Sequence, residues 1–139
     1  MELVVDANVL LASFLKEGTT RALLLDTRLK LYAPEHLISE ISRHLEETAA
    51  LRHRIGLSAE EILGLFRLLT RHIQTVPKES YKKQMSEALN LAPHEEDAPY
   101  LAVALLLNIP IWSSDRGLSE QNEVQVYSTP QIIALLENR

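Results

Sequence analysis

The chain contains no cysteine. This absence excludes disulfide bonds, a thiolate nucleophile and any zinc or iron–sulfur centre that depends on cysteine ligands. The five histidines show no spacing typical of a metal site either. A catalytic centre in this chain would therefore have to be built mainly from oxygen-bearing side chains.

Long hydrophobic runs are also missing. The longest, at residues 101–107, is far shorter than the roughly 20 apolar residues of a membrane-spanning helix. Met1 and Glu2 lead directly into a strand-like pattern, without the basic and apolar segment of a secretory signal. We therefore expect a cytoplasmic protein with no membrane segment.

The sequence has no excess of basic charge, and its formal net charge is −5 at pH 7. A protein that only binds nucleic acid normally carries a basic surface, so this balance argues against a simple nucleic-acid binder. A nuclease is still compatible with it, because bound divalent cations offset several carboxylates and a few arginines near the cleft then suffice.

What the sequence does contain is a regular alternation of strand and helix patterns over 139 residues, a length suited to one domain. Strands separated by helices of ten or more residues predict a parallel sheet covered by helices, so we expect a single α/β domain over residues 1–139. The expected strands are 2–6, 31–33, 73–76, 109–113 and 124–127. The expected helices are 8–16, 20–26, 34–51, 58–70, 80–91, 97–108 and a last one capped by Thr129-Pro130.

Four carboxylates lie where such a fold presents groups to a ligand. Asp6 closes the first strand and Asp115 follows the fourth, while Asp97 opens an apolar helix and Glu40 lies on a helix between them. In open parallel sheets, ligands bind beyond the carboxyl ends of the strands, where the strand order reverses. If the first and fourth strands are neighbours, Asp6 and Asp115 converge, and the two helices can bring the other carboxylates to the same place.

Carboxylates that meet at one place repel one another unless a cation lies between them. An all-oxygen site favours Mg²⁺ or Mn²⁺ over zinc. Such ions activate water and stabilise the leaving oxygen of a phosphodiester, so no nucleophilic side chain is needed. The pattern therefore predicts a metal-dependent phosphodiesterase.

Simpler interpretations exist for each carboxylate. Asp6 can cap the helix that starts beside it, and Asp97 can interact favourably with the dipole at its own helix start. Asp115 can be a turn residue, and Glu40 can be a solvated helix charge. Phosphatases with a nucleophilic strand-end Asp need a second Asp two residues later, where this chain has Asn8. Receiver domains need an acidic pair after the first strand, which is also missing.

Four polar neighbours are secondary candidates. Ser113 can hold a water or a substrate phosphate, or simply form a local hydrogen bond. Asn8 can orient Asp6 or merely occupy the first helical turn. Arg21 and Arg116 are candidates for contact with substrate phosphate, with surface ion pairs as the alternative.

The same residues resemble the motifs of the PIN-domain family. The opening V-V-D-A-N-V-L is similar to the first motif of that family, with Asp6 as the metal-binding Asp and Asn8 as its polar partner. The stretch from Asp97 to Asp115 resembles the most specific block, which also contains Ser113, and I-S-E-I-S-R-H-L carries the helical Glu as Glu40. The motifs occur in the expected order along essentially the whole chain.

This resemblance implies a three-layer α/β/α sandwich with about five parallel strands and an Mg²⁺- or Mn²⁺-dependent ribonuclease acting on RNA. Many small prokaryotic members are VapC-like toxins that pair with an antitoxin, and many form homodimers. Many members also carry an acidic residue two positions after the last Asp, where this chain has Gly117. The resemblance thus implies coordination by three or four carboxylates.

Two further expectations concern binding. A rival hypothesis is a catalytically weak PIN-like module that binds RNA or another protein, although crowded carboxylates would bring such a module no benefit. A homodimer is suggested by the 58–70 helix, whose apolar residues exceed one core-facing stripe. They are Ile62, Leu63, Leu65, Phe66, Leu68 and Leu69.

Overall fold

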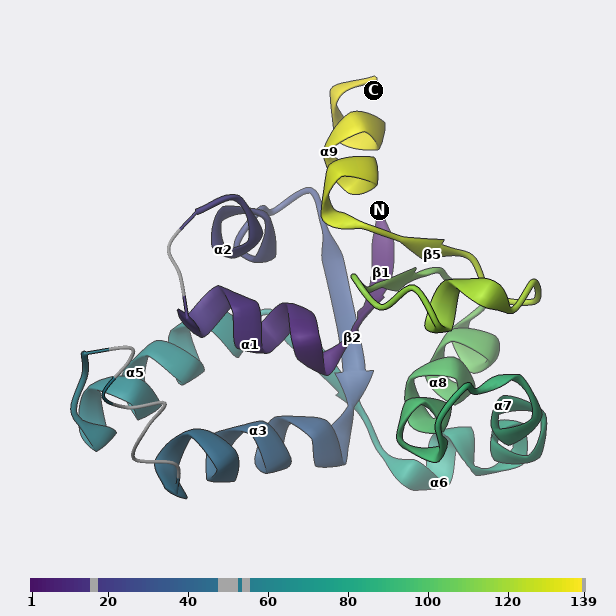
Figure 1. Cartoon of the computed structure of the whole chain (residues 1–139), viewed down its shortest axis with the longest axis horizontal. Coiled ribbons are helices and arrows are strands. Elements are labelled where there is room, and N and C mark those ends of the chain that lie inside the picture. Colours follow the sequence, from purple (N-terminus) through teal and green to yellow (C-terminus); the bar gives the residue numbers. More distant parts are fainter. Residues whose placement is uncertain (16–17, 48–52, 54–55, 139) are drawn as a thin grey trace.

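The computed structural model describes residues 1–15, 18–47, 53 and 56–138, apart from the side chains of residues 15, 40, 44–47 and 59 (Figure 1). Its five strands form one parallel sheet in the order β3-β2-β1-β4-β5, which confirms the predicted α/β class. The strands are β1 (Glu2–Val5), β2 (Lys30–Pro34), β3 (Ile73–Val76), β4 (Ile111–Trp112) and β5 (Val126–Tyr127).

Helices cover both faces of this sheet and complete the three-layer sandwich. Figure 1 shows α1, α2, α3 and α5 on one side of the strands and α6, α7 and α8 on the other. The first group comprises α1 (Ala7–Leu15), α2 (Thr19–Leu24), α3 (Glu35–Glu47) and α5 (Ala59–Thr70). The second comprises α6 (Lys78–Tyr81), α7 (Met85–Leu91) and α8 (Ala98–Leu107), and α9 (Thr129–Glu137) follows β5.

The centre of the core is the contact between β1 and α8. Leu3, Val4 and Val5 of β1 are all fully buried, which is expected of a central parallel strand covered on both faces. Helix α8 is apolar around most of its circumference and is correspondingly buried from Leu101 to Ala104. Residues that follow β1 or precede α8 are therefore attached to the most rigid part of the molecule.

The single helix predicted for residues 80–91 was wrong. The segment consists of α6, a 3₁₀ turn at Lys82–Gln84 and α7. Of α6 and the turn only Tyr81 is buried, and of α7 only Ala88. The segment has no apolar stripe of its own, and its path is set by packing against α8.

Helix starts and strand ends differ from prediction for local reasons. Ser58 and Glu61 form the predicted capping box, but the last helix is capped by Ser128 with Gln131, not by Thr129. The Thr129 hydroxyl instead accepts a hydrogen bond from Trp112 Nε1 at 3.0 Å. Strand β4 is shorter than predicted because the chain leaves α8 through Asn108 in the left-handed conformation (φ 56°), and Pro110 has no amide hydrogen to donate.

Among the described residues, no helix has both the length and the apolar character needed to cross a bilayer.

Candidate metal centre

The strand order brings the first two aspartates together. β1 pairs with β2 on one side and with β4 on the other, so the order reverses between β1 and β4, as predicted. Asp6 directly follows β1, and its amide donates a hydrogen bond to the Trp112 carbonyl at 3.1 Å. Ser113 directly follows β4, and its hydroxyl donates to Asp6 Oδ2 at 2.6 Å. The carboxyl ends of two neighbouring strands thus hold the first carboxylate in place.

Ser113 also connects Asp6 to Asp115. The Asp115 amide donates to Ser113 Oγ at 3.0 Å, and Asp115 Oδ1 accepts from the Gly117 amide at 2.9 Å. A Cβ atom at position 117 would lie 3.3 Å from Asp115 Oδ1, so any side chain there would crowd this carboxylate. The Gly117 amide thus holds the Asp115 carboxylate in place.

Asp97 lies across from this pair, at the start of α8. It occupies the N-cap position, yet its side chain makes no capping hydrogen bond. Its Oδ2 atom is buried and has no hydrogen-bond partner among the described residues. Asp97 therefore does not cap α8 through its side chain, and a buried acceptor without a partner among the described residues needs an explanation.

Burial and neighbouring aspartates act together on the pKa values of Asp6 and Asp97. Burial raises the pKa of Asp6, with a further increase from Asp115, against the lowering effect of Ser113 and the amides of Ala7 and Asn8. Burial also raises the pKa of Asp97, and the charges of Asp115 and Asp6 raise it further. Ionised Asp6 and Asp97 are thus both destabilised by burial and by neighbouring carboxylates, an environment that a bound cation relieves.

A divalent cation with oxygen ligands fits this set of residues. The partnerless Oδ2 of Asp97 and the mutual repulsion of Asp6, Asp97 and Asp115 are both satisfied by a hard cation. Within the described part of the chain, however, no three acidic or histidine side chains already have the arrangement of a metal site. Convergence of four carboxylates on one ion stays a prediction, because the Glu40 side chain lies outside the described residues.

The other predicted residues have different surroundings. Glu40 is on α3, four residues after His36 in the sequence, and Asn8 is exposed on the first turn of α1. Arg116 is exposed next to Asp115. Arg21 donates through Nε to the Ser13 carbonyl at 2.6 Å and through Nη2 to the carbonyl of residue 14 at 3.2 Å. These carbonyls lie about 10 Å along α1 from Asp6 at 1.5 Å per residue, so this placement gives no support to phosphate binding by Arg21.

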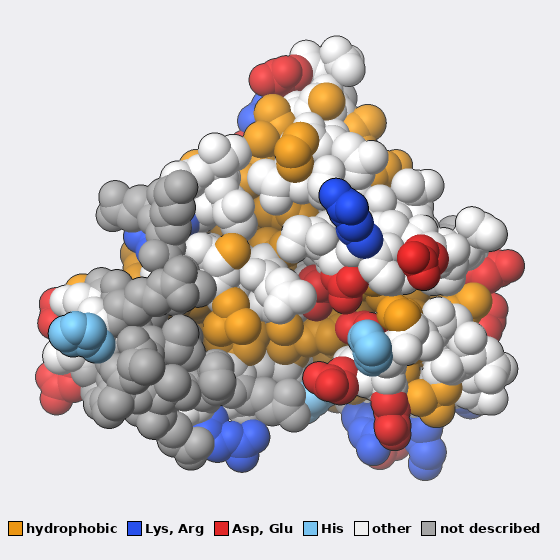
Figure 2. Space-filling view, viewed as in Figure 1, with side chains coloured by type: hydrophobic (Ala, Val, Ile, Leu, Met, Phe, Trp, Pro, Cys, Tyr) orange, Lys and Arg blue, Asp and Glu red, His pale blue; other side chains and the backbone are white. Residues whose placement is uncertain are grey.

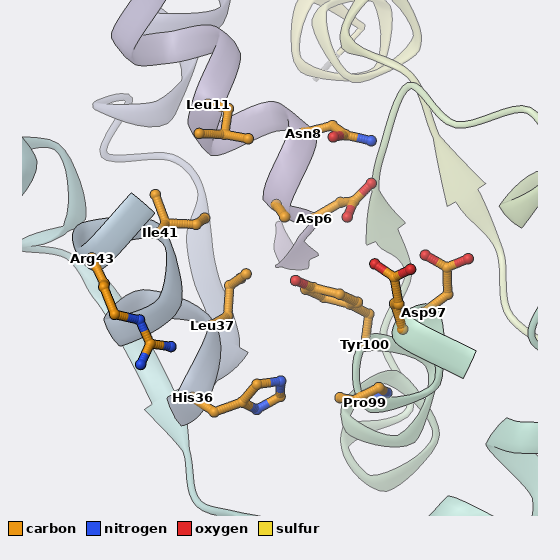
Figure 3. Close-up of a pocket in the computed structure, with 12 residues that line it drawn as sticks. Asp6, Asn8, Leu11, His36, Leu37, Ile41, Arg43, Asp97, Pro99 and Tyr100 are labelled. Carbon is orange, nitrogen blue, oxygen red and sulfur yellow. The ribbon is translucent and has the colours of Figure 1, made fainter. Parts of the chain in front are cut away.

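A cavity of about 720 Å³ opens in front of Asp6 and Asp97 (Figure 3). Figure 2 shows a hollow with hydrophobic side chains on its floor and acidic side chains gathered at one end. Leu11, Leu37 and Ile41 contribute to the apolar lining. A site of this kind combines a charged end with an apolar surface on which part of a substrate can lie.

Sequence reasoning missed several residues of this cavity. Tyr100 is three residues after Asp97 on the same helical face, a spacing that the sequence already contained. His36 and Arg43 come from α3, which begins directly after β2. Their positions at the cavity could not be predicted, because a histidine and an arginine on an amphipathic helix form no distinctive pattern.

Comparison with known families gives a result that matches this geometry. The model of the PIN domain matches residues 4–130. The curated proteins include no match to the chain. PIN domains are generally nucleases and generally use divalent metal ions. The match spans nearly the whole chain and all three aspartates, so this chain belongs to the PIN-domain family and has its nuclease-type fold.

Proposed function

We propose that the protein is an endoribonuclease that depends on Mg²⁺ or Mn²⁺ and hydrolyses RNA phosphodiesters at the aspartate cluster. The observation that carries this proposal is the buried Oδ2 of Asp97, which has no hydrogen-bond partner in the part of the chain that the structure describes, beside the Ser113–Asp6 pair. A passive RNA- or protein-binding module would gain nothing from this arrangement, because the repulsion destabilises the fold.

In this proposal some residues hold the cation and others position its ligands and the attacking water. Asp6, Asp97 and Asp115 would hold the cation, and Glu40 would act as a fourth ligand or as the base that aligns the attacking water. When bound, such a cation lowers the pKa of water and offsets negative charge on the phosphate. Ser113 fixes the orientation of the Asp6 carboxylate, since its hydroxyl both donates to Asp6 and accepts from the Asp115 amide.

A biological role as the toxin of a toxin–antitoxin pair is part of this proposal and rests on the family resemblance alone. An antitoxin protein and a second copy of the chain are the partners it implies. In α5, Ile62, Phe66 and Leu69 face the core, while Leu68 is 51% exposed. The apolar surplus that suggested a homodimer is thus reduced largely to Leu68 among the described side chains.

The test is cleavage of a mixed RNA pool in Mn²⁺ by wild type, Asp6→Asn and Asp26→Asn. Asp26 is a matched control because it precedes β2, at the opposite end of the sheet from Asp6. We expect EDTA to abolish cleavage, Mn²⁺ to restore it, and Asp6→Asn to lower the rate at least about a hundredfold. Loss of a group that merely orients a metal ligand typically costs 10–100-fold. Asp26→Asn should stay within about twofold of wild type.

Two results would count against the proposal. Cleavage that survives both EDTA and Asp6→Asn would belong to a contaminating nuclease. A wild-type protein that cleaves no RNA with either metal would favour the non-catalytic module instead.

A further inference from the structure

A second cavity, of about 540 Å³, adjoins the aspartate cavity. His36 and Pro99 line both cavities, so the two are neighbours that share a wall. His36 comes from α3 and Pro99 from α8, and Figure 3 shows the imidazole directed toward Pro99 across the opening. A chain-like ligand that leaves the aspartates past these two residues would enter the second cavity.

Tyr81 contacts His36 at the wall that the two cavities share. Its hydroxyl lies 3.4 Å from His36 Nδ1, and its side chain is only 2% exposed. This contact joins α6 to the beginning of α3. The imidazole therefore has a fixed neighbour at the point where the two cavities meet.

The lining of the second cavity combines two kinds of surface. Met85 and Pro99 supply apolar surface above the nearly buried Tyr81, Lys78 and Ser39 supply a cation and a hydroxyl, and Glu35 adds a carboxylate to the rim. A nucleotide needs both, because its base stacks on aromatic or apolar groups and its phosphate attracts a cation. The volume also falls within the roughly 300–1,000 Å³ typical of small-ligand sites.

Several basic side chains lie beside these cavities, although the chain as a whole is acidic and Glu35 and Glu96 also line the cavities. Arg43 lines the first cavity, Lys78 lines the second, and Lys82 and Lys83 follow as exposed residues of the next turn. Figure 2 shows Lys and Arg side chains at the lower edge of the molecule, below α3 and α6. The positive charge of these side chains attracts a polyanion such as the RNA backbone.

We propose that the cavity formed by His36, Ser39, Lys78, Tyr81, Met85 and Pro99 binds a nucleotide of the RNA that flanks the scissile phosphate. The base packs against Met85 and Pro99, and Lys78 pairs with the adjoining phosphate. The inference rests on the proposed ribonuclease function and adds a substrate subsite to it.

The test compares steady-state cleavage of a short mixed-sequence RNA by four variants in Mn²⁺. Lys78→Ala removes the cation, and Ser39→Trp fills the cavity from an exposed helix position without changing charge. Lys30→Ala and Ala134→Trp are the matched controls, since Lys30 is exposed at the opposite end of the sheet and Ala134 is exposed on α9.

We expect KM to rise roughly three- to tenfold in Lys78→Ala, with a salt dependence of binding reduced by about one ion. Ser39→Trp should raise KM about tenfold, because it excludes a stacked base. Both should keep the wild-type rise in melting temperature with Mn²⁺, which shows an intact aspartate centre. The two controls should stay within about twofold of the wild-type KM.

An active wild type whose KM is unchanged in both cavity variants would overturn the subsite and leave the cavity to another occupant, such as a peptide. An effect of Lys78→Ala without an effect of Ser39→Trp would overturn it as well, because charge alone would then explain binding. If the wild type cleaves no RNA at all, the proposed function fails first. The two failures are therefore distinguishable.

Discussion

The aspartates at the two ends of the sheet have opposite electrostatic environments. At the amino end of β2, Asp26 accepts hydrogen bonds from Arg28 Nε at 3.1 Å, Nη2 at 2.7 Å and the Arg28 amide at 2.9 Å. Arg28 lowers the pKa of Asp26 to about 2. At the carboxyl end, Asp6 and Asp97 have raised pKa values, and Asp97 Oδ2 has no partner among the described residues.

This contrast separates a carboxylate that is neutralised within its own turn from carboxylates that would be suited to bind a cation. Where Asp26 only completes a turn, the chain supplies its own cation two residues later. Where the strand order reverses, burial and the charges of Asp115 and Asp6 raise the pKa of Asp97, and the charge of His94 offsets this increase only in part. The proposed metal ion from solution would offset the remaining charge.

The contrast can be sharpened by removing one hydrogen-bonding side chain from each end. Ser113→Ala takes a donor from the nearly buried Asp6 and an acceptor from the Asp115 amide, so unfolding should become easier by about 1–3 kcal/mol. Arg28→Ala removes a partner whose side chain is 61% exposed, so its effect should be much smaller and should shrink with added salt. Urea unfolding of the two variants in EDTA measures both. A larger loss of stability in Arg28→Ala than in Ser113→Ala would contradict this comparison.

A smaller effect is expected in the pH dependence of stability without metal. Asp97 and Asp6 have folded-state pKa values above 3.8, so their contribution to stability is present below about pH 4 and is lost as pH rises through those values. Asp26 has a lowered pKa, so its contribution is present above about pH 4 and is lost as pH falls toward 2.

The measurement is the free energy of unfolding in EDTA from about pH 2 to pH 8, for wild type, Asp97→Asn and Asp26→Asn. Asp97→Asn should flatten the decline on the alkaline side, and Asp26→Asn should flatten the decline on the acid side. Mn²⁺ should reverse the alkaline decline in wild type, because it binds the ionised carboxylates of the folded state. Parallel pH curves for all three proteins would show that these aspartates do not differ in environment.

Much of the fold could be predicted from the sequence, because strand and helix patterns are strong in elements that are buried on all sides. The continuous apolar run of β1 and the apolar face of α8 are signals of full burial, and the sheet confirms them. The segment from Lys78 to Leu91 was not predictable in detail. Its few buried residues are determined by packing against α8, and they follow no helical periodicity in the sequence.

The candidate site was predictable in part, for a related reason. Asp6 and Ser113 are each fixed by the end of a strand, and strand ends can be located from sequence. His36, Tyr81 and Lys78 meet through the packing of α3 against α6, which depends on side-chain contacts far apart in the chain. A role of Arg21 in phosphate contact stays a prediction, because the sequence does not specify which backbone carbonyls this arginine contacts.

The most direct test of the central claim is Mn²⁺ binding followed by electron paramagnetic resonance, in which bound Mn²⁺ loses the signal of the free ion. Wild type and Asp26→Asn should bind the ion with equal affinity. Asp97→Asn should bind it at least about tenfold more weakly, since its amide supplies no charge. Equal binding by wild type and Asp97→Asn, or no binding by wild type at millimolar Mn²⁺, would contradict a metal centre at the carboxyl end of the sheet.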